Sequence, residues 1–150
     1  MKKLLLLLVF TIALILTACN STDSKAEKLF MDVFNYTVNE TGKDIKLKHH
    51  EIIYSAPNDS LSVIEFTSSV AGIGTETMYF AYVVAHDGED YWVMLTNNPV
   101  ENMKDLNSIS KTSNKEKSEK LLYSTIRAIC SLKYADGGGK TVKDTKAMLK

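Results

Sequence analysis

Residues 44–97 alternate between apolar and polar side chains with a period of two and are rich in β-branched and aromatic residues. This period is typical of β-strands that bury one face. Turn-forming residues interrupt the pattern at 56–59, 72–74 and 87–88, where proline, glycine, asparagine or aspartate occurs. The segment therefore predicts consecutive antiparallel strands joined by short turns. The four predicted strands cover 44–55, 60–70, 75–86 and 90–97.

The first predicted strand changes phase at His49 and His50, because the apolar residues before and after this pair occupy opposite alternate positions. An extra residue in one strand of an antiparallel pair produces such a phase change. We therefore expect a β-bulge there. Neighbouring residues on a strand point to opposite faces, so the two histidines are poorly placed to share a metal ion.

Helical spacing flanks the predicted strands on both sides. Apolar residues recur at intervals of three and four over about 25–40, after a capping box formed by Ser24 and Glu27, and Gly42 supplies a left-handed stop. A second broad apolar face extends over about 115–134. The predicted fold class is α+β, a four-stranded antiparallel meander flanked by an N-terminal and a C-terminal helix.

The domain organisation follows from these elements. Residues 26–134 are long enough for one globular domain with its own core. Within it, Pro99 favours the start of a short helix. Residues 135–150 contain three consecutive glycines and several lysines, which predicts a flexible tail.

The first residues of the chain have a different character. A basic start precedes an apolar run of thirteen residues at 4–16, shorter than the roughly 20 residues of a membrane-spanning helix. The run ends in Leu16-Thr17-Ala18-Cys19. This order of basic, apolar and small residues before a cysteine resembles the lipobox of bacterial lipoproteins.

The resemblance implies that residues 1–18 are a signal peptide, that Cys19 carries diacylglycerol and palmitate, and that residues 19–25 are a short tether. Two or more acyl chains hold a protein durably on a bilayer. The implied location is the bacterial cell envelope. Asn20 in place of aspartate favours the outer membrane in a Gram-negative cell, and the location is otherwise the cell membrane. An ordinary signal peptide with a chance cysteine, or an uncleaved helix, are the alternatives.

Charge and cysteine content narrow the possible partners. The chain has 18 basic and 18 acidic residues, so nothing in its charge indicates nucleic-acid binding. With Cys19 lipidated, Cys130 has no intramolecular disulfide partner. Cys130 shares a helical stripe with Leu122 and Ile126, so we expect a buried side chain there rather than a nucleophile.

With a two-residue turn at Asp87-Gly88, both faces of the last predicted hairpin carry apolar side chains. One face would then carry Tyr79, Trp92 and Met94. Two interpretations remain open. Helices or the 98–114 segment cover both faces, or these three residues form an exposed patch that binds a protein partner.

Motifs of known chemistry are missing from the sequence. No Cys-x-x-Cys, His-Glu-x-x-His or Gly-x-Ser-x-Gly spacing occurs, and Gly139-Lys140-Thr141 lacks the earlier glycine of a phosphate-binding loop. We therefore expect no metal, no cofactor and no catalytic residue. The favoured hypothesis is a non-catalytic binding, inhibitory or accessory module acting on another envelope protein. The alternative is a small envelope hydrolase whose site lies near His86, Glu89 and Asp90.

Overall fold

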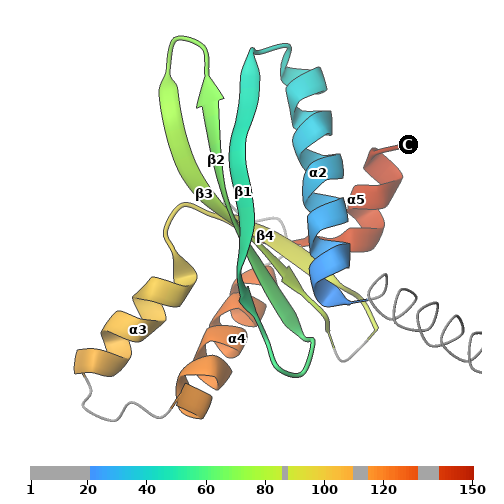
Figure 1. Cartoon of the computed structure of the whole chain (residues 1–150). Coiled ribbons are helices and arrows are strands. Elements are labelled where there is room, and N and C mark those ends of the chain that lie inside the picture. Colours follow the sequence, from blue (N-terminus) through green and yellow to red (C-terminus); the bar gives the residue numbers. More distant parts are fainter. Residues whose placement is uncertain (1–20, 86–87, 110–114, 132–138) are drawn as a thin grey trace, which may run out of the picture.

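The computed structural model describes residues 21–85, 88–109, 115–131 and 139–150. These residues form an antiparallel sheet of five strands in the order β1-β2-β3-β4-β5, with helices on both of its faces (Figure 1). The strands are β1 Ile45–Ser55, β2 Leu61–Val70, β3 Gly74–Val83, β4 Tyr91–Leu95 and β5 Lys140–Thr141. The helices are α2 Thr22–Thr41, α3 Pro99–Ile109, α4 Lys115–Ser131 and α5 Val142–Met148. The predicted α+β class is confirmed, and the predicted number of four strands is wrong because β5 adds to the edge of β4.

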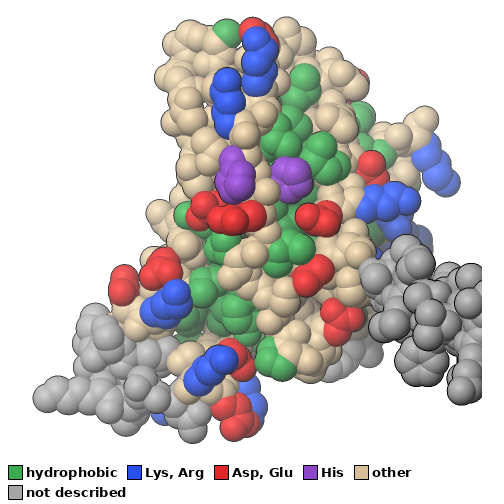
Figure 2. Space-filling model, in the orientation of Figure 1, with side chains coloured by type: hydrophobic (Ala, Val, Ile, Leu, Met, Phe, Trp, Pro, Cys, Tyr) green, Lys and Arg blue, Asp and Glu red, His purple; other side chains and the backbone are tan. Residues whose placement is uncertain are grey.

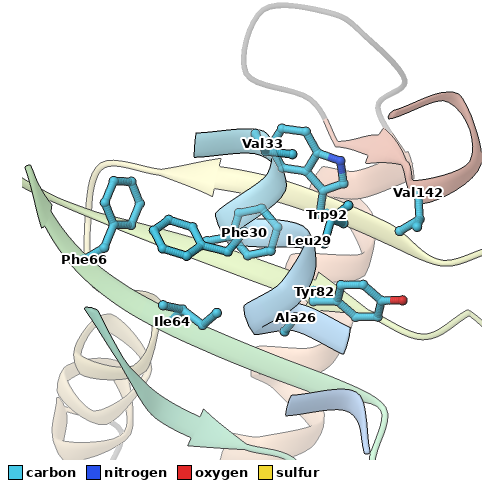
Figure 3. Packing of buried hydrophobic residues seen from close by; sticks show 10 residues of the cluster. Ala26, Leu29, Phe30, Val33, Ile64, Phe66, Tyr82, Trp92 and Val142 are labelled. Carbon is cyan, nitrogen blue, oxygen red and sulfur yellow. The ribbon is translucent and has the colours of Figure 1, made fainter. Parts of the chain in front are cut away.

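Each face of the sheet has its own hydrophobic cluster. On one face, α2 and α5 pack over the cluster shown in Figure 3, in which Phe30 of α2 lies among Phe66, Phe80 and Trp92. On the other face, Leu122 and Ile126 of α4 pack against a separate cluster formed by the opposite sides of β2, β3 and β4. The two clusters account for the strands in which almost every residue is apolar, because such strands are buried on both sides.

Helix α2 begins earlier than predicted. Its N-cap is Ser21, whose side chain accepts a hydrogen bond from the backbone N–H of Ser24, so Ser24 belongs to the first turn instead of capping it. The helix ends as predicted at Gly42, whose φ of 58° is left-handed. Residues 22–25, which the sequence assigns to the tether, are helical, and residues 19 and 20 lie outside the described part of the chain.

Strand β1 contains two bulges. The register with β2 shifts between Leu47 and His49, as the phase change predicts, and again between Ile52 and Tyr54. His50 turns toward α2, where its ring centroid lies 5.6 Å from that of Phe30. His49 pairs with Thr67 and is exposed, so the two histidines lie on opposite faces as expected.

The connection between β3 and β4 is longer than the predicted two-residue turn. Strand β3 ends at Val83 and β4 begins at Tyr91, so seven residues, 84–90, join them. The register is therefore shifted by one residue from the expected pairing, and Tyr82 pairs with Trp92. A shift of one residue moves every side chain to the other face.

The C-terminal segment folds onto the sheet, which contradicts the predicted flexible tail over 139–150. Residues 132–138 lie outside the described part of the chain. Thr141 caps α5 by accepting a hydrogen bond from the N–H of Asp144, and the N–H of Val142 donates to the carbonyl oxygen of Asp90 at 2.8 Å. Val142 then enters the α2-side cluster. The helix docks through Val142 and Thr145, which are buried, whereas its lysines and Met148 are exposed.

Candidate binding groove

The predicted binding patch does not exist as a surface. Trp92 is 5 % exposed and Tyr79 is 9 % exposed, while Met94 is half-buried. The register shift places Tyr79 on the α4 side and Trp92 and Met94 on the α2 side. The indole of Trp92 stacks on Phe80 with 5.2 Å between the ring centroids. The interpretation in which both faces are covered is confirmed, and the exposed patch is wrong.

Trp92 is held in place by the C-terminal helix. Its indole N–H donates to the hydroxyl oxygen of Thr145 in α5 at 2.8 Å, and the Thr145 hydroxyl in turn donates to the carbonyl oxygen of Thr141. The Lys140 ammonium lies 5.5 Å from the centre of the Trp92 ring, within the range of a cation–π contact. The residue is therefore structural.

Only part of the alternative site at the 86–90 tip belongs to the described residues. His86 and Asp87 lie outside them, whereas Glu89 and Asp90 are described. The carboxylate of Asp90 accepts a short hydrogen bond from the phenol of Tyr82. Burial, and then this carboxylate, raise the pKa of Tyr82 well above its ordinary value, so the phenol stays protonated. Asp90 thus anchors the connection from β3 to β4.

Carboxylates also meet on the part of the sheet that α3 and α4 leave open. Glu51 pairs directly with Glu65 across β1 and β2, and the imidazole of His49 lies 3.8 Å from a carboxylate oxygen of Glu51. The Glu51 and His49 side chains are each 58 % exposed. Within the described ranges, no group of three or more histidine, cysteine, aspartate or glutamate side chains is arranged to hold a metal ion.

A partly apolar recess lies between the end of β1 and the two helices α3 and α4. We call it the α3–α4 groove. Its volume is about 790 Å³. Figure 2 shows hydrophobic surface at this place, over the lower part of β1, with lysine and carboxylate side chains on the α3 and α4 sides. The side chains that give it its apolar character are Ile53, Tyr54, Pro57, Val100, Met103 and Leu122.

Local sequence explains how α3 comes to border this groove. The Asn98 side chain caps the helix by accepting hydrogen bonds from the N–H groups of Val100 and Glu101, at 3.0 and 3.2 Å. Val100 and Met103 lie three residues apart and therefore on one face of α3. That face packs against α4 and leaves a space above the end of β1.

A second recess continues on the far side of Met103 and Leu122, since these two residues line both spaces. Its volume is about 190 Å³, and Leu95, Ile126 and Ile129 contribute apolar surface to it. Methionine has an unbranched, flexible side chain that adapts to irregular spaces. Met103 therefore forms part of the wall between the two recesses.

Charged groups border the groove. The Lys104 ammonium lies 2.7 Å from a carboxylate oxygen of Glu101, and the Lys115 ammonium lies 4.0 Å from one of Glu119. The Lys115 side chain is 92 % exposed. Partial burial, and then the negative charge of Glu119, raise the pKa of the Tyr54 phenol. The groove therefore has apolar walls and a charged margin, and the Lys115 ammonium at this margin is exposed to solvent.

The groove adjoins the start of α2. Ser55, which lines the groove, donates its hydroxyl hydrogen to the Asp23 carboxylate at 2.6 Å. Two residues beyond Pro57, Asp59 accepts a hydrogen bond from the N–H of Thr22 at 2.9 Å. The same end of the molecule thus carries both the groove and the N-terminus of α2.

Sequence reasoning missed this groove. The sequence interpretation offered 98–114 as one possible cover for the second face, and it treated the apolar residues of the later helix as one face of that helix. The available signal was the short amphipathic stretch after Pro99, whose Val100 and Met103 have few apolar neighbours in the sequence to pack against. The side chain of Cys130 in α4 lies outside the described part of the chain, so its expected burial stays a prediction.

Among the described residues, no helix has both the length and the apolar character that a bilayer crossing requires. Cys19 and the rest of the predicted signal peptide lie outside these residues. No protein-family model, curated protein or solved structure matches the chain.

Proposed function

We propose that this protein is a bacterial lipoprotein, anchored in the cell envelope through lipid on Cys19, and that its domain is a non-catalytic binding module. The α3–α4 groove is the proposed binding site for an apolar part of another envelope component. The sequence hypothesis was a protein partner, whereas the groove itself specifies only an apolar ligand. The observation that carries the proposal is the position of this apolar recess beside the N-terminus of α2.

The proposed anchor would hold the groove close to a bilayer. Cys19 and Ser21, the cap of α2, are two residues apart, a distance of at most about 7 Å in an extended chain. A binding site at this end meets membrane components at high local concentration. An outer-membrane position in a Gram-negative cell, or the cell membrane otherwise, stays part of the proposal.

Binding is favoured over hydrolysis by the state of the candidate groups. Asp90, a member of the hypothetical hydrolase site, is hydrogen-bonded to a buried phenol. The described residues lining the groove contain two lysines that face carboxylates, and they contain no histidine that could serve as a general base. An apolar recess of this size is suited to holding a ligand.

The anchor is tested by growing cells with an alkyne-labelled fatty acid and detecting the label on the purified protein. We expect the wild-type chain to be labelled, Cys19→Ser to lose the label, and Cys130→Ser to keep it. Cys130→Ser is the matched control because these are the two cysteines of the chain. Persistence of the label in Cys19→Ser would contradict the proposed anchor.

The binding site is tested with a photo-crosslinking amino acid placed at Met103 in intact cells. Leu121, which is 45 % exposed on α4, provides the control position outside the groove. We expect an adduct with an envelope component at position 103 and a several-fold weaker one at position 121. Equal adducts at both positions would show that the groove has no special affinity.

A further inference from the structure

We propose that the α3–α4 groove binds the hydrocarbon chain of a long-chain fatty acid, with the carboxylate of the ligand at Lys115. This inference deepens the proposed binding function and rests on it. It commits to one ligand class, which the size, lining, charge and position of the groove together favour.

The size of the groove indicates a small ligand. Its volume of about 790 Å³ falls within the range of about 300–1,000 Å³ typical of small-molecule sites. A stable protein partner instead needs about 800 Å² of surface on each side, spread over a broad patch. The structure offers a recess confined to β1, the turn that follows it, α3 and α4.

The lining of the groove favours a flexible apolar chain. Val100, Met103 and Leu122 form apolar walls, and Met103 separates the groove from the second recess of about 190 Å³. The two spaces adjoin each other at Met103 and Leu122. An alkyl chain can follow a bent path because each of its bonds rotates, and every methylene that leaves water contributes about 0.8 kcal/mol.

The charge at the margin favours a single anionic head. Lys115 and Glu119 both line the groove, with 4.0 Å between the ammonium and the carboxylate, and the Lys115 side chain is 92 % exposed. This weak ion pair can be exchanged for a closer one between Lys115 and the carboxylate of a ligand. Lys104, by contrast, forms a close ion pair of 2.7 Å with Glu101. One compact carboxylate at Lys115 matches this arrangement, with the hydrocarbon chain directed toward Met103.

The groove lies near the proposed anchor, and therefore near the bilayer in which fatty acids are dissolved. Ser55 and Pro57 line its wall, and Ser55 is hydrogen-bonded to Asp23 in the first turn of α2, just after the proposed anchor. Fatty acids dissolve in bilayers, so a groove at the membrane-facing end could take up a chain without moving it through bulk water.

The test uses the full mature chain on phosphatidylcholine vesicles that contain palmitate with a diazirine group on its hydrocarbon chain. Irradiation is followed by mass spectrometry of the labelled peptides. We expect adducts on peptides that contain Tyr54, Met103 or Leu122. Met103→Trp, which fills the groove, should lower these adducts at least about fivefold, whereas Leu121→Trp on the exposed side of α4 should leave them unchanged.

The head group is tested in the same vesicles. Lys115→Glu should reduce labelling by the palmitate probe several-fold and leave labelling by an uncharged monoacylglycerol probe unaltered. Lys46→Glu, at the far end of β1, is the matched charge control and should behave as wild type.

Three outcomes would overturn the inference: equal groove labelling in wild type and Met103→Trp, groove labelling by a lysophospholipid probe and not by palmitate, or cross-linking of Met103 to a polypeptide that palmitate does not displace. Vesicle flotation separates these outcomes from failure of the anchor. Palmitate distributes between vesicles and water, so groove labelling is measured whether or not the chain floats.

Discussion

At the scale of single residues, some buried polar side chains in the described part of this domain have a hydrogen-bond partner and one does not. The Trp92 indole N–H and the Tyr82 phenol each find a buried acceptor, from Thr145 and Asp90. The Ser62 hydroxyl, in contrast, is fully buried and has no hydrogen-bond partner among the described residues. Because an unmatched buried hydroxyl costs more than a matched one contributes, these residues lead to opposite predictions.

Tyr82→Phe should change how stability depends on pH. The raised pKa of Tyr82 means that the folded state retains its proton above pH 10, whereas the unfolded state, with a pKa near 10.0, releases it. Tyr82 therefore contributes stability below pH 10 that is lost as the pH rises further. We expect urea unfolding between pH 9 and about 11 to show a shallower loss of stability for Tyr82→Phe than for wild type. Parallel curves would contradict the buried phenol.

Ser62→Ala should leave the protein as stable as wild type or more stable, by up to about 1 kcal/mol, because it removes an unmatched buried hydroxyl. Thr145→Val is the contrasting variant, since it removes an acceptor of the Trp92 N–H and should cost about 1–2 kcal/mol. Urea unfolding measures both. A clear loss of stability in Ser62→Ala would reveal a partner for that hydroxyl.

At the scale of elements, sequence predicts what periodicity and turn residues encode. The first helix, its stop at Gly42, the bulge near His49 and the start of a helix at Pro99 all follow from local signals, and the structure contains them. The β3–β4 register was missed because Asp90 and Val142 organise a longer connection through tertiary hydrogen bonds. Neither contact is visible in a local pattern.

The same limit applies to the C-terminus and to the candidate site. Helix α5 has only seven residues, too few for a periodic signal, and it is stabilised by docking on the sheet. The α3–α4 groove arises from the spacing of α3, α4 and β1, which no residue pattern specifies. The sequence did indicate which apolar residues lie on the two sheet faces. In the structure these side chains form the two buried clusters and not a binding site.

Ending the chain after Gly139 should test α5 as an element. The truncation removes Val142 from the core and the hydroxyl of Thr145 from Trp92, so we expect a loss of at least about 2 kcal/mol in unfolding free energy. Trp92 is the one tryptophan of the chain, and its fluorescence should shift to longer wavelength as water reaches it. Unchanged emission and stability would show that residues 140–150 contribute nothing to the folded domain.

At the scale of the whole molecule, the sheet has two distinct ends. The start of α2, the turn after β1 and the α3–α4 groove lie at one end, tied together by the contacts of Thr22 with Asp59 and of Asp23 with Ser55. The β2–β3 hairpin, with Ile73 67 % exposed, lies at the other end (Figure 1). Strand β2 separates them by about 30 Å, at about 3.3 Å per residue.

An anchor at Cys19 should therefore orient the domain on a bilayer. We expect a fluorophore on Asn58→Cys to transfer energy to acceptor-labelled lipid headgroups more efficiently than one on Ile73→Cys, both in a Cys130→Ala background. The control is the unanchored Cys19→Ser chain mixed with vesicles. Equal transfer from both positions of the anchored chain would mean that the domain has no fixed orientation.

The two bulges of β1 also bear on how many copies could share one membrane. Strand β1 forms one border of the sheet, and the two-residue β5 forms the other. A long regular border would invite a neighbouring molecule to continue the hydrogen-bond ladder, a hazard that grows when proteins diffuse in two dimensions. Here the interrupted border and the very short one limit such stacking.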